Sequence, residues 1–235
     1  MSCLLHIETS TAVCSVALSL DGEIIFEKSS FEGSSHAALL GVYAEEALAV
    51  LKRKSILLDA VAVSSGPGSY TGLRIGVSLA KGLCFGFNIP LISVPTLELL
   101  ASRAIRFCRD VACNTSTYCA MLDARRMEVY AAIYDADLQL VRSAAADIVT
   151  PDTYAPYLEA GKVYFFGNGA AKCKTVITSP NAAFIDDVYP LAADMAPIAE
   201  ARFRAGKFED VAYFEPFYLK EFQATIAKNK VLPLS

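Results

Sequence analysis

The sequence predicts an α/β protein of two similar lobes, each with a mixed sheet flanked by helices. Strand-like apolar runs alternate with helix-like runs along the 235 residues, and this alternation is typical of α/β folds. The order of a strand, an acidic residue at its end and a hairpin occurs twice. Glu8 and a turn at Asp21 stand in the first half, and Asp123 and a turn at Asp135 stand in the second. Such internal repetition indicates duplicated units.

The first half begins with three expected strands. Residues 4–9 are almost continuously apolar, and the alternating runs 15–20 and 23–29 flank Asp21-Gly22. This dipeptide tolerates the positive φ angles of a tight hairpin turn. We therefore expect a buried strand followed by a β-hairpin.

Helices and strands then alternate to the end of the first half. We expect a helix over 34–54, a strand over 60–65, a helix over 71–87, a strand over 89–94 and a helix over 96–108. Ser34 or Ser35 can cap the first of these helices. Lys52, Arg53 and Lys54 suit its negative C-terminal end.

The second half repeats this pattern. We expect a strand within 118–126, a hairpin over 127–143 with its turn at 135–137, a strand before a glycine turn within 162–171, and a helix over 190–206 that stops at Gly206. The boundary between the lobes should lie near residues 102–117. We therefore expect a first lobe of residues 1–106 and a second lobe of residues 107–235.

The composition is that of a folded protein that does not hold nucleic acid by itself. Apolar residues make up 54% of the chain, charged residues 20%, and the net charge is −4. Proteins hold nucleic acid mainly through Lys and Arg, so an acidic chain would contact tRNA only within a complex. Seven cysteines, an odd number, stand without a C-x-x-C pair, which favours a reducing compartment.

The N-terminal segment and the apolar runs predict a cytoplasmic protein without a membrane partner. The start "MSCLLHIETS" has no basic region before its short apolar run, unlike a signal peptide. No apolar stretch reaches the roughly 18 residues of a membrane-spanning helix. We expect no membrane association.

The loop "SSGPGSYTGLRIG" stands between a strand and a helix. It lacks the lysine of a P-loop and the spacing of a dinucleotide-binding G-x-G-x-x-G motif. Free amides at the start of the helix could still meet an anion. The alternative, a tight and close-packed turn made by Pro67 and the glycines, is the interpretation we favour.

Acidic and glycine residues at the ends of strands suggest a second possibility, a nucleotide site. Two acids that face each other across a cleft would suit magnesium–nucleotide chemistry, whereas a hydroxyl-rich turn is the simpler interpretation. The candidate nucleotide-binding residues are Glu8, Thr9, Ser10, Gly66, Gly68, Asp123, Gly167 and Gly169. His6 and His36 have no partner at a ligand spacing, so we expect no metal site.

The first two helices are more apolar than one buried face requires. Leu40, Ala44, Leu48 and Leu51 form one stripe, and Leu39, Tyr43 and Val50 form a second. In the next helix, Gly72/Gly76 and Gly82/Gly86 recur at four-residue spacing, which lets backbones approach closely. Both helices could be buried within one lobe. We favour the alternative, an interface with another chain.

Several motifs together resemble the TsaB (YeaZ) family over essentially the whole chain. They are "HIETSTAVCSVALSLDG", "GPGSYTGLRIGVSLAKGLCFGFNIPLISVPTLELLA", "LDARRMEVYAAIYD", "FGNGAA" and "EPFYLK". The resemblance implies the duplicated two-lobe fold of the actin, hexokinase and Hsp70 superfamily (ASKHA, ribonuclease H-like). This agrees with the repetition of the strand pattern.

The resemblance also implies a function in synthesis of the threonylcarbamoyl modification of adenosine in tRNA. Members of the family are non-catalytic partners of the paralogous transferase TsaD, with the ATPase TsaE as a third component. When the chain is alone, we expect it to form a homodimer through the same surface. No cofactor is expected on the isolated chain, although ATP or ADP could bind in the complex. The partner-interface residues implied in the first two helices are Leu39, Val42, Tyr43, Glu46, Val50, Arg74, Val77 and Lys81.

One segment distinguishes the paralogues. The TsaD family has an H-M-E-G-H motif whose histidines bind the catalytic metal, and the matching residues here are Thr96 to Leu100. Leucine cannot ligate a metal, and Thr96 is a poor ligand for transition metals. No catalytic residue is therefore expected. Glu8 departs from the aspartate common in the TsaB family, and the tail after Tyr218 has no clear counterpart in it.

Two other functions remain open from the sequence. The chain could be an ATPase or phosphotransferase that uses Glu8, Asp123 and the loop at 66–72 across a cleft. It could also be a metallopeptidase, although only two histidines are present.

Overall fold

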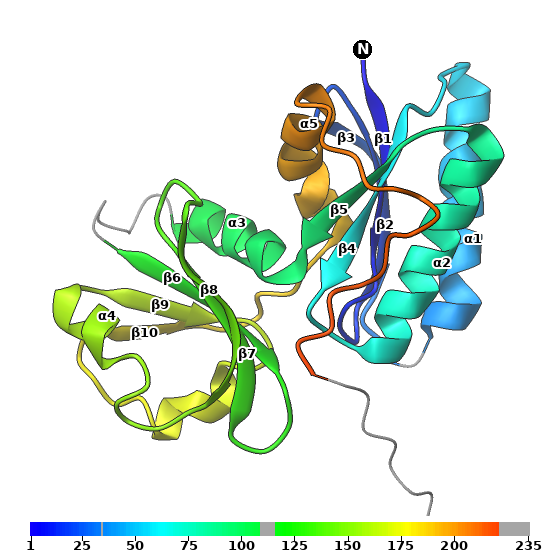
Figure 1. Ribbon diagram of the computed structural model, residues 1–235. Coiled ribbons are helices and arrows are strands. Elements are labelled where there is room, and N and C mark those ends of the chain that lie inside the picture. The colour runs from blue at the N-terminus through cyan, green and yellow to red at the C-terminus, as the bar shows by residue number, and fades with distance from the viewer. Residues whose placement is uncertain (34, 109–115, 221–235) are drawn as a thin grey trace, which may run out of the picture.

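The computed structural model describes residues 1–33, 35–108 and 116–220, which form two lobes (Figure 1). Each lobe contains one five-stranded sheet. The first sheet has the order β3-β2-β1-β4-β5, with β1 Cys3–Glu8, β2 Cys14–Leu20, β3 Glu23–Ser30, β4 Ala60–Gly66 and β5 Leu91–Pro95. The second has the order β10-β9-β6-β7-β8, with β6 Thr117–Asp123, β7 Glu128–Tyr134, β8 Leu140–Ile148, β9 Val163–Phe166 and β10 Ala182–Ile185.

The two sheets have the same topology. In each, three strands form an antiparallel meander, a fourth strand pairs in parallel with the first of them, and the fifth pairs in parallel with the fourth. Strand β1 thus corresponds to β6, and β4 corresponds to β9. The duplicated two-lobe α/β fold with mixed sheets is therefore confirmed.

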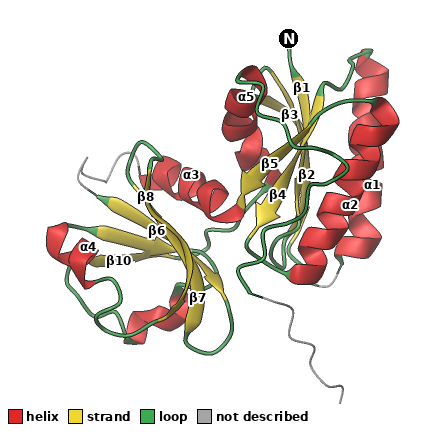
Figure 2. Cartoon of the chain, in the orientation of Figure 1, coloured by secondary structure: helices red, strands yellow, loops and turns green. Residues whose placement is uncertain are grey.

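Helices flank both sheets (Figure 2). They are α1 His36–Lys54, α2 Tyr70–Phe87, α3 Thr96–Cys108, α4 Ala155–Ala160 and α5 Ala196–Arg204, with the short 3-10 helices η1 Ala171–Thr175 and η2 Ala192–Met195. The expected helix over 190–206 is interrupted, because η2 precedes α5. Its predicted stop is confirmed, since Gly206 has a φ of +63° just after α5. The sequence did not indicate α4.

Two helices pack at the boundary between the lobes, and Leu99 of α3 also packs with Leu4 of the first sheet. Helix α3 follows the first sheet in the chain, yet Leu100 and Ala104 pack against Tyr118 of the second sheet. Helix α5 follows the second sheet, yet Ile198 packs with Leu4 of the first. The division of the chain at residues 106 and 107 stays a prediction.

Local sequence signals determine the turns around the first sheet. Asp21 and Gly22 both have positive φ angles in the β2–β3 turn, as the Asp-Gly pair predicts. Ser35 is the N-cap of α1, but its hydroxyl donates to the Glu32 carbonyl and accepts no hydrogen bond from a helix amide. The other candidate cap, Ser34, lies outside the described residues.

Both helix stripes expected in α1 pack against the first lobe. Leu40, Val50 and Leu51 are buried in the cluster that α1 and α2 form over the sheet, and Ala44 is buried as well. The half-buried Leu39, Tyr43 and Leu48 pack against the same cluster. A second stripe therefore does not by itself indicate a second partner. The six described cysteines are free and buried, and no helix among the described residues is long and apolar enough to cross a bilayer.

Candidate functional site

The glycine-rich loop packs the start of α2 directly onto the segment that follows β1. A Cβ atom on Gly68 or Gly72 would lie under 3.0 Å from the carbonyl oxygen of Ser10 or Thr9. A Cβ on Gly76 would collide with the Thr9 hydroxyl. Only glycine permits this approach. The loop is thus the close-packed turn that the sequence favours.

Backbone amides in this region already have partners. The Ser10 amide donates to Glu8 Oε1 at 2.5 Å, and the Ser69 amide donates to the Ser10 carbonyl at 2.6 Å. The Gly72 amide donates to Ser69 Oγ, which caps α2. These three amides are therefore not available to a phosphate.

Glu8 is fully buried beneath this loop. Burial raises the pKa of its carboxyl group to about 7, although bonding to Ser10 opposes the shift. Its second oxygen, Oε2, has no hydrogen-bond partner, and neither do the buried hydroxyls of Ser10 and Ser64. A protonated carboxyl group in this position explains how an acid is tolerated at the end of a core strand.

A polar cleft of about 1090 Å³ lies where the two lobes meet. Of the candidate nucleotide-binding residues, Ser10, Gly68 and Asp123 line this cleft. Glu8 and Thr9 are buried. The structure therefore brings only part of the candidate set together at one surface.

The remaining candidates have structural contacts. Gly66 has a φ of +103° and would clash with the Phe217 carbonyl if it carried a Cβ. Gly167 has a φ of +95° and lies against the Met121 carbonyl, and Gly169 lies against Leu122. These glycines serve turns in both lobes.

Asp123 differs from Glu8 in its environment. It is exposed, forms an ion pair with Lys172, and accepts a hydrogen bond from the Arg125 amide. Its own amide donates to Asn168 at 2.9 Å. The two acids at corresponding strand ends therefore have opposite solvation, and they do not form a symmetric pair.

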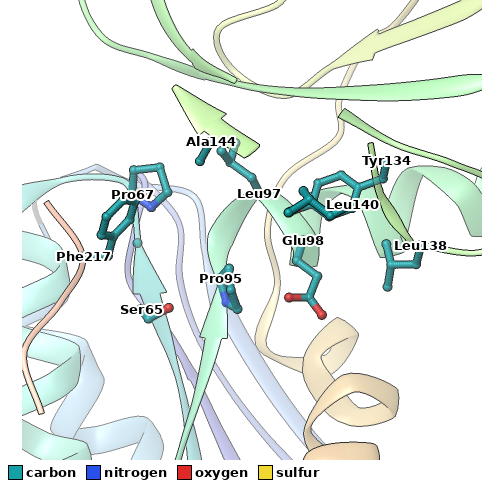
Figure 3. A pocket seen from close by; sticks show the side chains of 11 residues that line it. Ser65, Pro67, Pro95, Leu97, Glu98, Tyr134, Leu138, Leu140, Ala144 and Phe217 are labelled. Carbon is teal, nitrogen blue, oxygen red and sulfur yellow. The ribbon is translucent and has the colours of Figure 1, made fainter. Parts of the chain in front are cut away.

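A second, smaller cavity of about 390 Å³ lies between the lobes (Figure 3). Pro67 and Phe217 form one side of it, and Tyr134 and Leu140 of the second lobe form the other. Glu98 also lines it and is bonded to Arg202 at 2.7 Å. The cavity is mostly apolar, and no sequence motif indicated it.

The candidate partner-interface residues of α1 lie at different depths. Val42 is 48% exposed, whereas Val50 is buried in the core cluster. Leu39 and Tyr43 are half-buried. Glu46 is half-buried and forms an ion pair with Lys28 of β3 at 2.8 Å.

The candidate interface residues of α2 contact the C-terminal part of the chain. Val77 is buried in the core. Lys81 donates to the carbonyl groups of Ala212 and Phe214 at 3.0 and 3.1 Å. Arg74 Nε lies 3.4 Å from the Tyr218 hydroxyl. One side of α2 is thus already covered.

Residues 207–220, which we call the strap, cross the first lobe and reach the second (Figure 1, orange to red). The Glu209 amide donates to the Leu91 carbonyl at 2.9 Å, and the Phe217 amide donates to the Ser65 carbonyl at 2.7 Å. Lys220 then forms an ion pair with Glu128 of β7. Sequence analysis missed the strap, although its aromatic residues were a signal of packing. Of the tail after Tyr218, only Leu219 and Lys220 are described.

The segment that matches the transferase motif also has structural partners. Thr96 and Leu100 are buried, and Glu98 is held by Arg202. Within the described ranges, no three His, Cys, Asp or Glu side chains gather in a group that could hold a metal ion.

Comparisons with known proteins agree with the two-lobe architecture and with the motifs. Residues 31–228 match the family described as TsaD, tRNA N6-adenosine threonylcarbamoyltransferase. The chain is 30% identical over 225 residues to the tRNA threonylcarbamoyladenosine biosynthesis protein TsaB of Escherichia coli, covering 92% of this chain and 94% of that protein. It is 31% identical over 182 residues to TsaB of Bacillus subtilis, covering 74% of each.

A solved structure is similar over nearly the whole chain. YeaZ from Pseudomonas aeruginosa superposes with a TM-score of 0.77 at 27% sequence identity, covering 93% of this chain and all of that one. Part of the chain also resembles a transferase. A tRNA N6-adenosine threonylcarbamoyltransferase of Nitratidesulfovibrio vulgaris is 37% identical over 107 residues, which is 39% of this chain and 30% of the transferase.

Proposed function

We propose that this chain, which belongs to the TsaB family of tRNA threonylcarbamoyladenosine biosynthesis proteins, is a non-catalytic subunit that pairs with a TsaD-like transferase. In this proposal the transferase carries out the threonylcarbamoyl transfer to adenosine in tRNA. A TsaE-like ATPase is the third component. The chain supplies the surface on which the transferase docks, and it forms a homodimer when it is alone.

The observation that carries this proposal is the outer face of α1 and α2. Gly41, Gly82 and Gly86 lie in these helices, and a Cβ at each would meet no atom within 4 Å. Glycine inside a helix is less favourable than alanine by about 1 kcal/mol, so three open glycines need another explanation. Val42 and Phe85 are 48% and 85% exposed on the same two helices. Such a surface permits close approach of apolar helices from a partner.

The segment after β5 supports the non-catalytic part of the proposal. In the transferase motif two histidines bind the metal, and here Thr96 and Leu100 stand buried in their places. The remaining acid, Glu98, is paired with Arg202. These side chains suit packing between helices and offer no nucleophile or metal ligand set.

The decisive experiment measures pairing with the TsaD-like transferase of the same organism. We expect Val42→Glu to weaken the complex by about 30-fold or more, since it places a charge in a desolvated apolar interface. Native mass spectrometry and size-exclusion chromatography measure the pairing. Nucleoside mass spectrometry of tRNA measures the modification, which should fall in parallel.

A matched variant separates docking from general damage. Ile148 on β8 is 72% exposed in the second lobe, so Ile148→Glu makes the same chemical change outside α1 and α2. It should leave pairing intact. Light scattering of the isolated chain should show a dimer that Val42→Glu converts to a monomer. Equal pairing by wild type and Val42→Glu would contradict the proposed docking face, and turnover by the isolated chain would contradict its non-catalytic assignment.

A further inference from the structure

The turn between β6 and β7 places two arginines side by side in an unfavourable backbone conformation. Arg125 and Arg126 have φ angles of +73° and +49°. The turn is closed by hydrogen bonds from the Ala124 amide to the Glu128 carbonyl and from the Glu128 amide to the Arg125 carbonyl. Side chains other than those of Gly, Asn and Asp are disfavoured at such positive φ angles. Arginine at both positions therefore indicates a function of the two side chains other than forming the turn.

The charge around this turn is positive, although the whole chain is acidic. The charged side chains grouped here are Arg125, Arg126, Lys172, Lys220, Asp123 and Glu128. The two lysines are paired with the two carboxylates. Within the described part of the chain, Arg125 and Arg126 have no acidic partner, and both are exposed. Two positive charges are therefore uncompensated.

Both arginines line the polar cleft between the lobes. Thr11 and Ser69 stand on its other wall and contribute hydroxyl groups. Free backbone amides at a helix N-terminus commonly hold the phosphates of a nucleotide. The amides of Ser10 and Ser69 are already bonded within the loop. The cleft thus offers cations at its rim and lacks free amides at these two positions in its wall.

We propose that Arg125 and Arg126 bind two phosphates of an RNA backbone that crosses the mouth of this cleft, the RNA being the tRNA substrate of the complex. Exposed arginines at a rim suit an extended phosphodiester chain, which needs cations and no enclosed pocket. The contacts fix the position of the RNA and carry no base specificity. This inference rests on the proposed function, because the proposed partnership is what brings tRNA to the chain.

The salt dependence of tRNA binding tests the inference. Fluorescence anisotropy with labelled tRNA is measured over a range of salt concentrations, for the chain with its transferase and for the chain alone. Loss of two phosphate contacts in Arg125→Gln/Arg126→Gln should lower the slope of log K against log salt by about 1.4 to 1.8. The control Lys162→Gln/Lys174→Gln removes the same charge from the same lobe, at residues outside the cleft lining, and should leave the slope unchanged.

A second variant excludes a purely structural function of the arginines. Arg125→Asn/Arg126→Gly supplies residues that tolerate the positive φ angles of these two positions. We expect its melting temperature to equal or exceed that of the wild type, while its slope falls as in the glutamine variant. A lower melting temperature with an unchanged slope would show that the arginines serve the turn alone, and would overturn the inference.

Pairing with the transferase is measured on the same samples, so the two proposals fail separately. Variants that pair normally but bind tRNA with the wild-type slope overturn the RNA site and leave the docking function intact. If the wild-type chain does not pair, the chain alone is titrated with tRNA at low salt, where electrostatic binding is strongest. Equal slopes for the wild type and the glutamine variant would then overturn the RNA site. Calorimetry with magnesium-ATP tests the last alternative, in which the two arginines bind a nucleotide. Loss of ATP binding with an unchanged tRNA slope would assign the arginines to a nucleotide and overturn the inference.

Discussion

The two lobes have the same strand order but very different helices on their outer faces. In the first lobe α1 and α2 contain 19 and 18 residues, whereas α4 and η1 of the second contain six and five. Short helices are sufficient to cover the second sheet, because its core on that face is closed by α4, η1 and the strands themselves. The longer pair exceeds what covering the sheet requires. The first lobe therefore has more outer helix surface than the second, which agrees with the proposed docking face.

The two lobes also share a close contact made by glycines. After the fourth strand of each lobe, a glycine with positive φ turns the chain, at Gly66 and at Gly167. A following glycine then lies against the end of the first strand or the segment just after it, Gly68 against Ser10 and Gly169 against Leu122. The second lobe has no long helix after this turn. The glycine loop is consequently a feature of the duplicated fold, and it is not by itself a signature of nucleotide binding.

The largest expected effect comes from filling the close contact between Gly72 and Thr9 in the first lobe. Gly72→Ala would place a Cβ under 3.0 Å from the Thr9 carbonyl, a backbone atom that cannot move freely. We expect a loss of about 3 kcal/mol or more in the free energy of unfolding. Gly169→Ala should cost less, because its nearest contact, to Leu122, is 2.8 Å. Urea denaturation measures both.

A glycine in the same helix is the control for this experiment. Gly82 has open space around it, so Gly82→Ala should raise stability by about 1 kcal/mol through helix propensity alone. Equal free energies of unfolding for Gly72→Ala and Gly82→Ala would show that close packing of the loop does not hold α2 against the end of β1. A larger loss at Gly169 than at Gly72 would reverse the comparison of the two lobes.

The acids at the corresponding strand ends give an effect of intermediate size. The pKa of Glu8 rises from 4.5 to about 7 in the folded state because the carboxyl is buried. The folded state therefore holds this proton where the unfolded state has lost it, and stability falls as pH rises from about 4.5 to 7. Glu8→Gln should leave stability unchanged near pH 4.5 and raise it by about 3 kcal/mol at pH 8.

A histidine on the same strand changes stability in the opposite direction. Burial lowers the pKa of His6 from 6.5 to about 3, so its contribution is complete above pH 6.5 and is lost as pH falls. Between pH 4.5 and 6.5 the two slopes oppose each other. The wild type should therefore show a flatter stability profile than Glu8→Gln, which retains only the histidine slope. Parallel profiles for the two proteins would contradict the burial of a protonated Glu8.

Much of the fold was readable from the sequence, and the misses have physical causes. Asp21-Gly22 and Gly206 identified their turns because these positions need positive φ angles. Periodicity in α1 showed two stripes, but it could not show that Leu39 and Tyr43 pack on the same lobe as Leu40. The strap escaped notice since its contacts, such as that of Phe217 with Ser65, join residues far apart in the chain. Burial likewise distinguishes Glu8 from Asp123, and burial is a tertiary property.

The smallest expected effect concerns an ion pair beside the proposed docking face. Glu46 bonds to Lys28 at 2.8 Å, and both side chains are 40% or more exposed. Such a pair adds little to stability because water screens it. Glu46→Gln should leave the urea midpoint unchanged and weaken pairing with the transferase by less than about fivefold.

The second lobe provides the comparison for this pair. Lys174 and Asp186 form a similarly exposed pair at 2.6 Å, on the lobe whose outer face carries only short helices. Asp186→Asn should change neither the midpoint nor the pairing. If Glu46→Gln lowers the affinity and Asp186→Asn does not, the docking face extends from α1 toward β3. If neither variant lowers the affinity for the transferase, the docking face is confined to the outer face of α1 and α2 around Gly41, Val42 and Gly82. The β3 side of α1 then does not contact the partner.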